Sequence, residues 1–223
     1  TLTEQIQVLL ESYRIAAIKT GLLGSSSHIS AVANALTGTE IPLVVDPVFS
    51  ASSGMDFGSS TAVEAYMTEL LPLALVTTPN LPEALRLLGQ NHHLDSERPC
   101  PNEIATELSN SLGISVLLTG GHSVTEGLLT DTFYSRGTTR EFTHPWIDLP
   151  SSHGTGCTHS AAITGLLGLD YDLEQAIPMA QALMTHILKT SYHWPLEEGS
   201  QEIHALNQLP PKSANLFGGI ELE

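Results

Sequence analysis

The sequence predicts an α/β fold in which a mostly parallel central sheet is flanked by helices on both faces. Short apolar runs alternate along the chain with segments of helical periodicity, as expected for successive strand and helix units. Residues 43–45 are continuously apolar, which is typical of a strand buried on both sides in a parallel sheet. The 223 residues are enough for one large core, and they contain no linker or internal repeat. We therefore expect residues 1–223 to form a single domain.

The first part of the chain predicts helices and strands mainly in alternation. Apolar residues recur at steps of three and four, the spacing of an amphipathic helix, over residues 2–13, 27–36, 61–71, 82–88 and 101–112. Short apolar runs between them predict strands at residues 15–18, 43–45, 73–77 and 114–118. Connections of this kind are normally right-handed crossovers between parallel strands.

The second part predicts a hairpin and two helices. The hairpin covers residues 132–143, with residues 136–139 at its turn. A glycine-rich turn at residues 153–156 leads into one helix. A longer helix follows from Asp172, where Asp172 and Gln175 have the spacing of a capping box and Pro178 predicts a kink. Residues 193–223 are rich in Pro, Gly and Glu and predict an irregular tail.

The composition excludes several classes of partner. Eight basic and 24 acidic residues give a net charge of −16, which opposes binding to nucleic acid. A phosphate ligand would need its charge masked by Mg²⁺ and by backbone donors. Cys100 and Cys157 provide no disulfide framework, so a reduced, cytoplasmic setting is expected. No apolar run approaches about 18 residues, so no membrane association is expected.

Polar or glycine-containing clusters follow four predicted strands, at residues 19–21, 46–47, 78–80 and 119–122. Ligands of parallel α/β sheets bind beyond the carboxyl ends of the strands. Because all four clusters occupy such ends, we expect them to form one candidate site.

The turn at residues 153–158 is the strongest single indication of a ligand. Gly154 and Gly156 let a ligand approach the backbone closely, and the helix start behind them offers unpaired N–H groups that favour an anion. Cys157 lies in the first helical turn, where the pKa of a thiol is usually lowered. The pattern predicts an anion site with a candidate base, although glycine turns before helices are also common without a ligand.

The other candidate residues each have a structural alternative. Asp46 suits a Mg²⁺ site reached through water, or merely a turn before proline. Asn80 and Glu83 would bring an amide and a carboxylate to a Mg²⁺–phosphate site, or would form a helix cap and its capping-box partner. Gly121 belongs to a Gly-Gly pair that suits either close nucleotide approach or an ordinary turn. Lys19 is either a cation of the site or a surface lysine.

Together these segments resemble a known family. Residues 44–48, 77–84, 118–122 and 153–158, in this order, are similar to the signatures of the hydroxymethylpyrimidine/phosphomethylpyrimidine kinases of thiamine biosynthesis, in the ribokinase superfamily. Residues 18–24 resemble a further segment of that family, and the likeness covers roughly residues 1–190. Cys157 stands where most of the superfamily has Asp, which is typical of the pyrimidine kinases and of some related pyridoxal kinases.

The resemblance implies a ribokinase-like fold, ATP and Mg²⁺ as cofactors, and a role for each candidate residue. Gly154, Thr155 and Gly156 would form the anion hole for the transferring phosphoryl group, and Cys157 would be the base toward the substrate hydroxymethyl group. The remaining roles would be Asp46 and Glu83 at the metal, Asn80, Glu83, Thr119, Gly121 and Lys19 at the nucleotide, and Leu22, Val48 and Cys157 at the pyrimidine.

Two departures from the family pattern affect what is expected. Thr119 replaces a lysine, so a cation near the ATP phosphates is missing and weaker nucleotide binding is expected. The family also opens with a Gly-Ser-Asp-x-x-Gly-Gly segment that supplies much of the pyrimidine site. We expect residues 1–223 to lack this segment, either because the sequence omits it or because the protein does.

The leading hypothesis is an ATP-dependent kinase acting on 4-amino-5-hydroxymethyl-2-methylpyrimidine, its monophosphate, or both. The alternatives are a pyridoxal or pyridoxine kinase, and a catalytically silent relative that binds a nucleotide or a pyrimidine. The resemblance also implies a homodimer, which members of the family often form.

Overall fold

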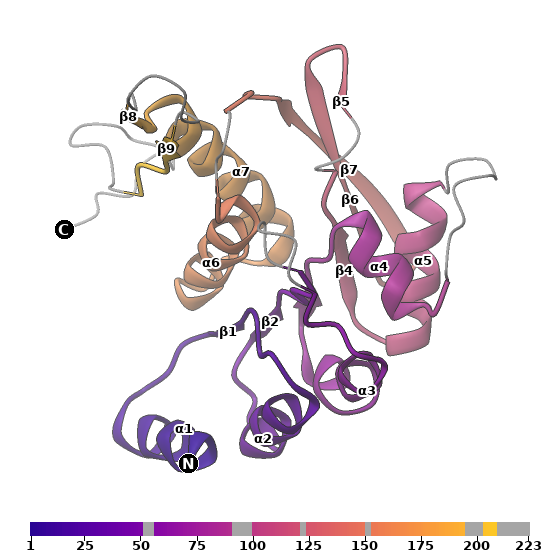
Figure 1. Ribbon diagram of the computed structural model, residues 1–223, viewed down its shortest axis with the longest axis vertical. Helices are drawn as coiled ribbons and strands as arrows, with labels where there is room; N and C mark the ends of the chain where they lie inside the picture. The colour runs from indigo at the N-terminus through magenta and orange to yellow at the C-terminus, as the bar shows by residue number, and fades with distance from the viewer. Residues whose placement is uncertain (51–55, 91–99, 121–123, 150–152, 195–202, 209–223) are drawn as a thin grey trace.

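A computed structural model describes residues 1–50, 56–90, 100–120, 124–149, 153–194 and 203–208 (Figure 1). Its main sheet has seven strands in the order β1-β2-β3-β4-β6-β5, and β7 also pairs with β6. Four strands are parallel, namely β1 (Ile18–Thr20), β2 (Leu43–Val45), β3 (Val76–Thr77) and β4 (Ser115–Leu118). Three antiparallel strands follow, β5 (Val124–Thr125), β6 (Leu128–Ser135) and β7 (Thr138–Pro145).

Helices cover both faces of this sheet, which confirms the predicted fold class. One apolar cluster packs residues of α1 (Leu2–Ser12), α2 (Ser26–Leu36), α3 (Ser60–Ala65), α4 (Leu81–Leu87) and α5 (Pro101–Leu112) against the sheet. The second cluster contains residues of α6 (Thr155–Gly168) and α7 (Leu173–Lys189). Figure 1 shows α6 and α7 together, apart from the other helices.

Alternation along the strands explains why two cores form. Successive side chains of a strand point to opposite faces of the sheet. Val44 and Leu117 accordingly join the cluster under α6 and α7, whereas their neighbours Val45 and Leu118 join the cluster on the other face. All four side chains are buried, as the continuous apolar runs of β2 and β4 predict.

Several predicted boundaries are corrected. The strand expected at residues 15–18 is β1 at Ile18–Thr20, which starts opposite Leu43 where β2 begins. The helix expected at residues 61–71 continues from α3 into a π-helical turn, η1 (Tyr66–Leu70), and a 3₁₀ turn, η2 (Leu71–Leu73). Because η2 takes up the start of the strand expected at residues 73–77, β3 has only two residues.

The C-terminal half follows its predicted order. The hairpin is longer than expected, and its two-residue turn has positive φ at both Arg136 (51°) and Gly137 (79°), as tight hairpin turns require. Asp172 and Gln175 form the predicted capping box of α7. The tail expected to be irregular from residue 193 contains a short antiparallel pair, β8 (Tyr192–Trp194) with β9 (Ile203–Ala205). Among the described residues, no helix is both long enough and apolar enough to cross a bilayer.

Candidate active site

The polar clusters predicted at the strand ends lie next to one another at one edge of the sheet. The carbonyl oxygen of Thr20, at the end of β1, accepts a hydrogen bond of 3.0 Å from the backbone N–H of Asp46. The backbone N–H of Thr78, after β3, donates a hydrogen bond of 3.0 Å to the carbonyl oxygen of Val45 at the end of β2. Asn80 forms an isolated parallel bridge with Thr119, which follows β4. Residues that follow β1, β2, β3 and β4 thus form one row.

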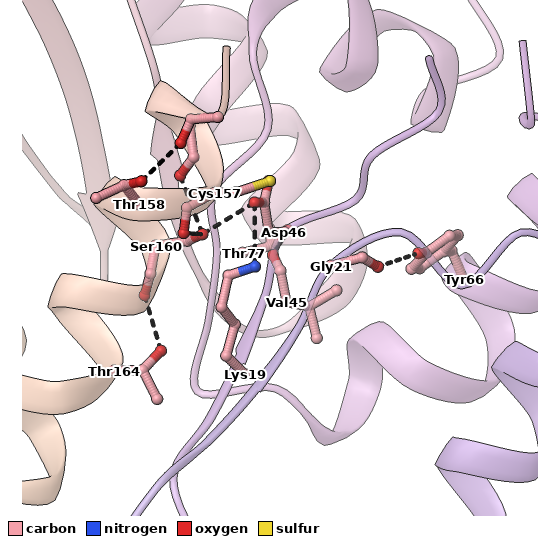
Figure 2. A network of polar contacts seen from close by, with 12 residues as sticks. Lys19, Gly21, Val45, Asp46, Tyr66, Thr77, Cys157, Thr158, Ser160 and Thr164 are labelled. Atoms are coloured by element: carbon pink, nitrogen blue, oxygen red, sulfur yellow. Dashed lines mark hydrogen bonds and ion pairs between the residues drawn. The ribbon is translucent and has the colours of Figure 1, made fainter. Parts of the chain in front are cut away.

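Asp46 is the buried anion of this row. Its side chain lies beside the Lys19 ammonium, with 3.5 Å between Lys19 Nζ and Asp46 Oδ2. Ser160 Oγ donates a hydrogen bond of 2.9 Å to the same oxygen (Figure 2). Asp46 is only 5 % exposed, and a buried carboxylate needs such partners to stay charged. Lys19 was expected either as a cation of the site or as a surface lysine, and the structure pairs it with Asp46. Its predicted role at the nucleotide stays a prediction.

Cys157 projects from the first turn of α6 toward Asp46, as Figure 2 shows. Its surroundings raise the pKa of the thiol, first through partial burial and then through the negative charge of Asp46, while Lys19 acts in the opposite direction. The expectation of a lowered pKa is therefore wrong. Partial burial, and after it the charge of a carboxylate 111 positions earlier in the chain, outweigh the favourable field of the helix start. Neither could be inferred from the local sequence.

The turn before α6 leaves its backbone donors available. Gly154 is the N-cap residue and has a left-handed conformation (φ 82°), and no side chain in the described part of the chain caps the helix. The first N–H groups of an α-helix have no partner within the helix, and they carry a partial positive charge. Gly154, Thr155 and Gly156 thus have the geometry of the predicted anion site, although no ligand contact tests that role.

A cavity of about 230 Å³ adjoins this turn, because Thr155 and Gly156 belong to its lining. Most of the wall is apolar and comes from the end of the hairpin and from α7, with the side chains of Leu129, Trp146, Ile147, Met184 and Leu188. Polar groups converge on the opposite part of the lining, from Thr119, Asp131, His144, His159 and Gln181. A concave apolar site with a few polar groups is typical of small-molecule binding.

Asp131 joins three elements around the cavity. It is 3 % exposed, and its Oδ1 accepts a hydrogen bond of 2.8 Å from the backbone N–H of Gly120. Its Oδ2 accepts a hydrogen bond of 2.7 Å from Gln181 Nε2 on α7 and lies 3.4 Å from His144 Nε2 on β7. Burial acts to raise the pKa of Asp131, but His144 and the other donors outweigh it and hold the pKa below its usual range.

Two histidines near Asp131 have opposite shifts. The hydrogen bond with Asp131 raises the pKa of His144, although burial opposes it. Burial lowers the pKa of His159, which is 8 % exposed. His159 Nε2 is buried and has no hydrogen-bond partner among the described residues, so the neutral ring leaves one polar atom unsatisfied.

Asn80 and Glu83 form the helix cap that the sequence offered as an alternative to a Mg²⁺–phosphate site. Asn80 Oδ1 accepts a hydrogen bond of 2.9 Å from the backbone N–H of Glu83, and Glu83 Oε2 accepts one of 2.8 Å from the backbone N–H of Asn80. This is a complete capping box for α4. Burial raises the pKa of Glu83 to about 7, and Asp46 contributes in the same direction. The cap does not test a role for either residue at a metal or phosphate.

The Gly-Gly segment is only partly described. An added Cβ at Gly120 would overlap the backbone of Thr130, so close packing alone requires glycine there. Gly121 lies outside the described residues, and its predicted role stays a prediction. Thr119 lines the cavity. Its backbone N–H donates a hydrogen bond of 2.9 Å to the carbonyl oxygen of Pro79, in the loop between β3 and α4.

Besides Cys157, two residues were assigned to the pyrimidine, and both lie on loops beyond β1 and β2. Leu22 is 46 % exposed, and the carbonyl of the adjacent Gly21 accepts a hydrogen bond of 3.3 Å from the Tyr66 hydroxyl. Val48 is half-buried two residues after Asp46. The structure places both near the row of strand ends without testing a substrate contact.

A sequence model of one family, described as phosphomethylpyrimidine kinase, matches residues 1–204. The chain belongs to the phosphomethylpyrimidine kinase family. This confirms the resemblance drawn from the strand-end motifs.

Similarity to individual proteins agrees with membership of this kinase family. The chain is 34 % identical over 189 residues to the hydroxymethylpyrimidine/phosphomethylpyrimidine kinase of Haemophilus influenzae, an alignment that covers 83 % of this chain and 69 % of the relative. It is 34 % identical over 197 residues to the thiamine biosynthesis bifunctional protein ThiED of Geobacter sulfurreducens, covering 88 % of this chain and 39 % of that protein. The chain thus spans well under half of the Geobacter protein.

The solved structures confirm the ribokinase-like fold. Pyridoxal kinase from Staphylococcus aureus, in complex with AMP-PCP and pyridoxal, superimposes with a TM-score of 0.74 at 26 % identity. The match covers 92 % of this chain and 71 % of the pyridoxal kinase. Phosphomethylpyrimidine kinases and pyridoxal kinases therefore share the architecture of this chain.

Sequence reasoning missed five polar residues of this candidate site, namely Ser160, Asp131, His144, His159 and Gln181. A signal existed for Asp131, because a carboxylate between the apolar pairs 128–129 and 133–134 is unusual in a segment with the composition of a strand. Ser160 and Gln181 gave no comparable signal, since serine and glutamine are common on the exposed faces of helices.

Proposed function

We propose that this protein is an ATP- and Mg²⁺-dependent kinase that phosphorylates 4-amino-5-hydroxymethyl-2-methylpyrimidine, its monophosphate, or both, in thiamine biosynthesis. The observation that carries the proposal is the position of Cys157, between an uncapped glycine turn and the buried carboxylate of Asp46. Membership of the phosphomethylpyrimidine kinase family and the names of the relatives support the substrate class.

The glycine turn of residues 154–156, called the anion turn below, and the adjoining cavity fit the two parts of a nucleotide. The free N–H groups of residues 154–156 would hold the transferring phosphoryl group, where fixed donors stabilise charge that develops in the transition state. The adjoining cavity would hold the nucleoside, with apolar side chains such as Trp146 and Met184 against the base. The pyridoxal kinase that superimposes on this chain was solved with AMP-PCP, which supports nucleotide binding.

The donors near β2 and α4 fit a magnesium ion. Asp46 is buried and Glu83 half-buried, and the charge of Asp46 acts on Glu83, so a cation near both would relieve unfavourable charge. Within the described ranges, no three His, Cys, Asp or Glu side chains are grouped to hold a metal. Mg²⁺ commonly uses one or two carboxylates together with water and phosphate oxygens, which matches this pair. When bound, the ion would neutralise phosphate charge during transfer.

Cys157 would receive the proton of the substrate hydroxyl. As that oxygen attacks the γ-phosphorus and the bond to the β-phosphate oxygen breaks, the hydroxyl proton would pass to a thiolate at Cys157 Sγ. The raised pKa means that the thiol is mainly protonated in the free protein. Lys19, which favours the thiolate, would therefore assist this step as well as stabilising Asp46.

The substrate and the activity are tested by measuring ADP release with each pyrimidine and with pyridoxal. We expect kcat/KM for the hydroxymethylpyrimidine or its monophosphate to exceed that for pyridoxal. A higher value for pyridoxal would favour the second candidate function, which the likeness to pyridoxal kinases supports. Calorimetric binding of ATP or of the pyrimidine without turnover would instead identify a silent relative, for which Thr119 is the motivating residue.

We also propose that the protein works as a homodimer in the cytoplasm. The two cysteines are free thiols, which fits a reducing compartment. The dimer rests on the family resemblance alone. Light scattering during size-exclusion chromatography would give its mass, and a monomeric mass across the working concentration range would contradict the dimer.

A further inference from the structure

Ser160 is a buried hydroxyl that connects the two halves of the candidate site. It has no exposed surface, and it follows Cys157 by three positions on α6. Its Oγ lies 2.9 Å from Asp46 Oδ2, and 3.1 Å from each of the carbonyl oxygens of Gly156 and Cys157 (Figure 2). Asp46 lies at the end of β2, so this side chain links the sheet edge to the first turn of α6.

The single proton of Ser160 goes to the carboxylate. A serine hydroxyl has one hydrogen to donate, and three oxygens lie within reach. Hydrogen bonds to a charged acceptor are roughly twice as strong as those to a neutral one. The carboxylate is also the nearest of the three oxygens. The two carbonyls lie within the helix, where backbone N–H groups already serve them.

This hydrogen bond is the shortest contact that fixes the orientation of Asp46. Lys19 Nζ lies 3.5 Å from the same Oδ2, a distance that provides charge but little directional constraint. Asp46 and Ser160 are both buried, so water does not compete for the carboxylate. The thiol of Cys157 also hydrogen-bonds the Asp46 carboxylate, so without Ser160 it would be the remaining uncharged side-chain donor to that carboxylate.

We propose that Ser160 is a positioning residue for phosphoryl transfer. By donating to Asp46 Oδ2 it holds that carboxylate in register with Cys157 and with the anion turn, and it limits the hydrogen bonding of the thiol to Asp46. This inference rests on the proposed function, since it assigns Asp46 and Cys157 to one reaction centre.

The substitution Ser160→Ala tests the proposal, with Thr164→Val as the matched control. Alanine is smaller than serine and a better helix former, so the helix is retained. Thr164 lies one turn further along α6 and donates at 2.8 Å to the carbonyl of Ser160, so Thr164→Val also removes a buried hydroxyl but leaves Asp46 untouched. We expect Ser160→Ala to lower kcat about ten- to hundredfold with little change in KM for ATP, because misplacement of reacting groups acts on the chemical step. Thr164→Val should keep kcat within about threefold.

A second readout does not depend on activity. In a Cys100→Ser background, the rate of alkylation of Cys157 by iodoacetamide at one fixed pH reports how strongly Asp46 holds the thiol. Ser160→Ala should slow alkylation at least about threefold, because Asp46 loses its competing donor and accepts more strongly from the thiol. An unchanged alkylation rate would overturn the positioning role, whatever the activity. Slower alkylation in proteins that turn over no pyrimidine would support the role of Ser160 and contradict the proposed kinase function.

Discussion

The thiol of Cys157 faces the carboxylate of Asp46, and partial burial together with this charged neighbour raises the pKa of the thiol. A helix start usually favours a thiolate. Here partial burial and the charge of Asp46 outweigh that effect, and Lys19 only partly offsets them. Burial of the thiol and the charges of Asp46 and Lys19 therefore together govern whether Cys157 is available as a base.

Asp46→Asn should make Cys157 more reactive while it makes the enzyme slower. Removing the negative charge lowers the pKa of the thiol, so alkylation by iodoacetamide near pH 8 should be several-fold faster. The same change removes a proposed magnesium ligand, so kcat should fall by roughly a hundredfold or more. Alkylation as slow as in the wild type would show that Asp46 does not control the thiol.

Asn80 and Glu83 can be separated into capping and metal roles by two substitutions. Asn80→Ala removes the cap of α4 and should reduce the free energy of unfolding by about 1 kcal/mol. Glu83→Gln retains an acceptor for the backbone N–H of Asn80, so stability should change little. If Glu83 also serves Mg²⁺, Glu83→Gln should raise the Mg²⁺ concentration needed for half-maximal rate. The same Mg²⁺ dependence in Glu83→Gln and the wild type would restrict Glu83 to the cap.

The pair of His144 and Asp131 should make stability depend on pH. The pKa of His144 is raised in the folded protein, so its protonated form stabilises the fold below the ordinary value of 6.5. That contribution is lost as the pH rises through the raised pKa. His144→Gln should therefore destabilise the protein more at pH 5.5 than at pH 8.5, as measured by urea unfolding. The same comparison in a His159→Phe background removes the contribution of His159, whose pKa is lowered by burial and in part by the charge of His144. Equal losses at both pH values would contradict the ion pair.

Thr119→Lys should tighten nucleotide binding. Thr119 lines the cavity, and its hydroxyl makes only a long contact of 3.4 Å with the carbonyl of Pro79. A lysine there would place a cation where a hydroxyl now stands, and one charge-assisted contact with phosphate is worth roughly a tenfold decrease in KM for ATP. Thr119→Ser provides the control without a cation. An unchanged KM in Thr119→Lys would show that this position does not meet the phosphates.

The alternation of strands and helices along the chain, the helical caps and the glycine turn could be predicted because they depend on local patterns. The capping boxes at Asp172 and Asn80 are examples, since each joins residues three positions apart. The contacts that govern the site are of another kind. Ser160 and Asp46 are 114 positions apart, and Gln181 and Asp131 are 50 apart. Their hydrogen bonds follow from how α6 and α7 pack on the sheet, and no local spacing encodes them.

The pKa of Cys157 also could not be predicted from local sequence. The position of this residue at the start of a helix was predicted correctly, and its local field was inferred from that position alone. The opposing charge comes from another strand end, and its distance from the thiol depends on tertiary packing.

The most direct test of the account is the rate of ADP formation with 4-amino-5-hydroxymethyl-2-methylpyrimidine for the wild type and for Cys157→Ala. Cys100→Ser, which removes the other exposed thiol, serves as the control. We predict turnover by the wild type and by Cys100→Ser, and a kcat for Cys157→Ala that is about a hundredfold or more lower with a much smaller change in KM. Equal kcat values for the wild type and Cys157→Ala would contradict the central claim that Cys157 accepts the substrate proton.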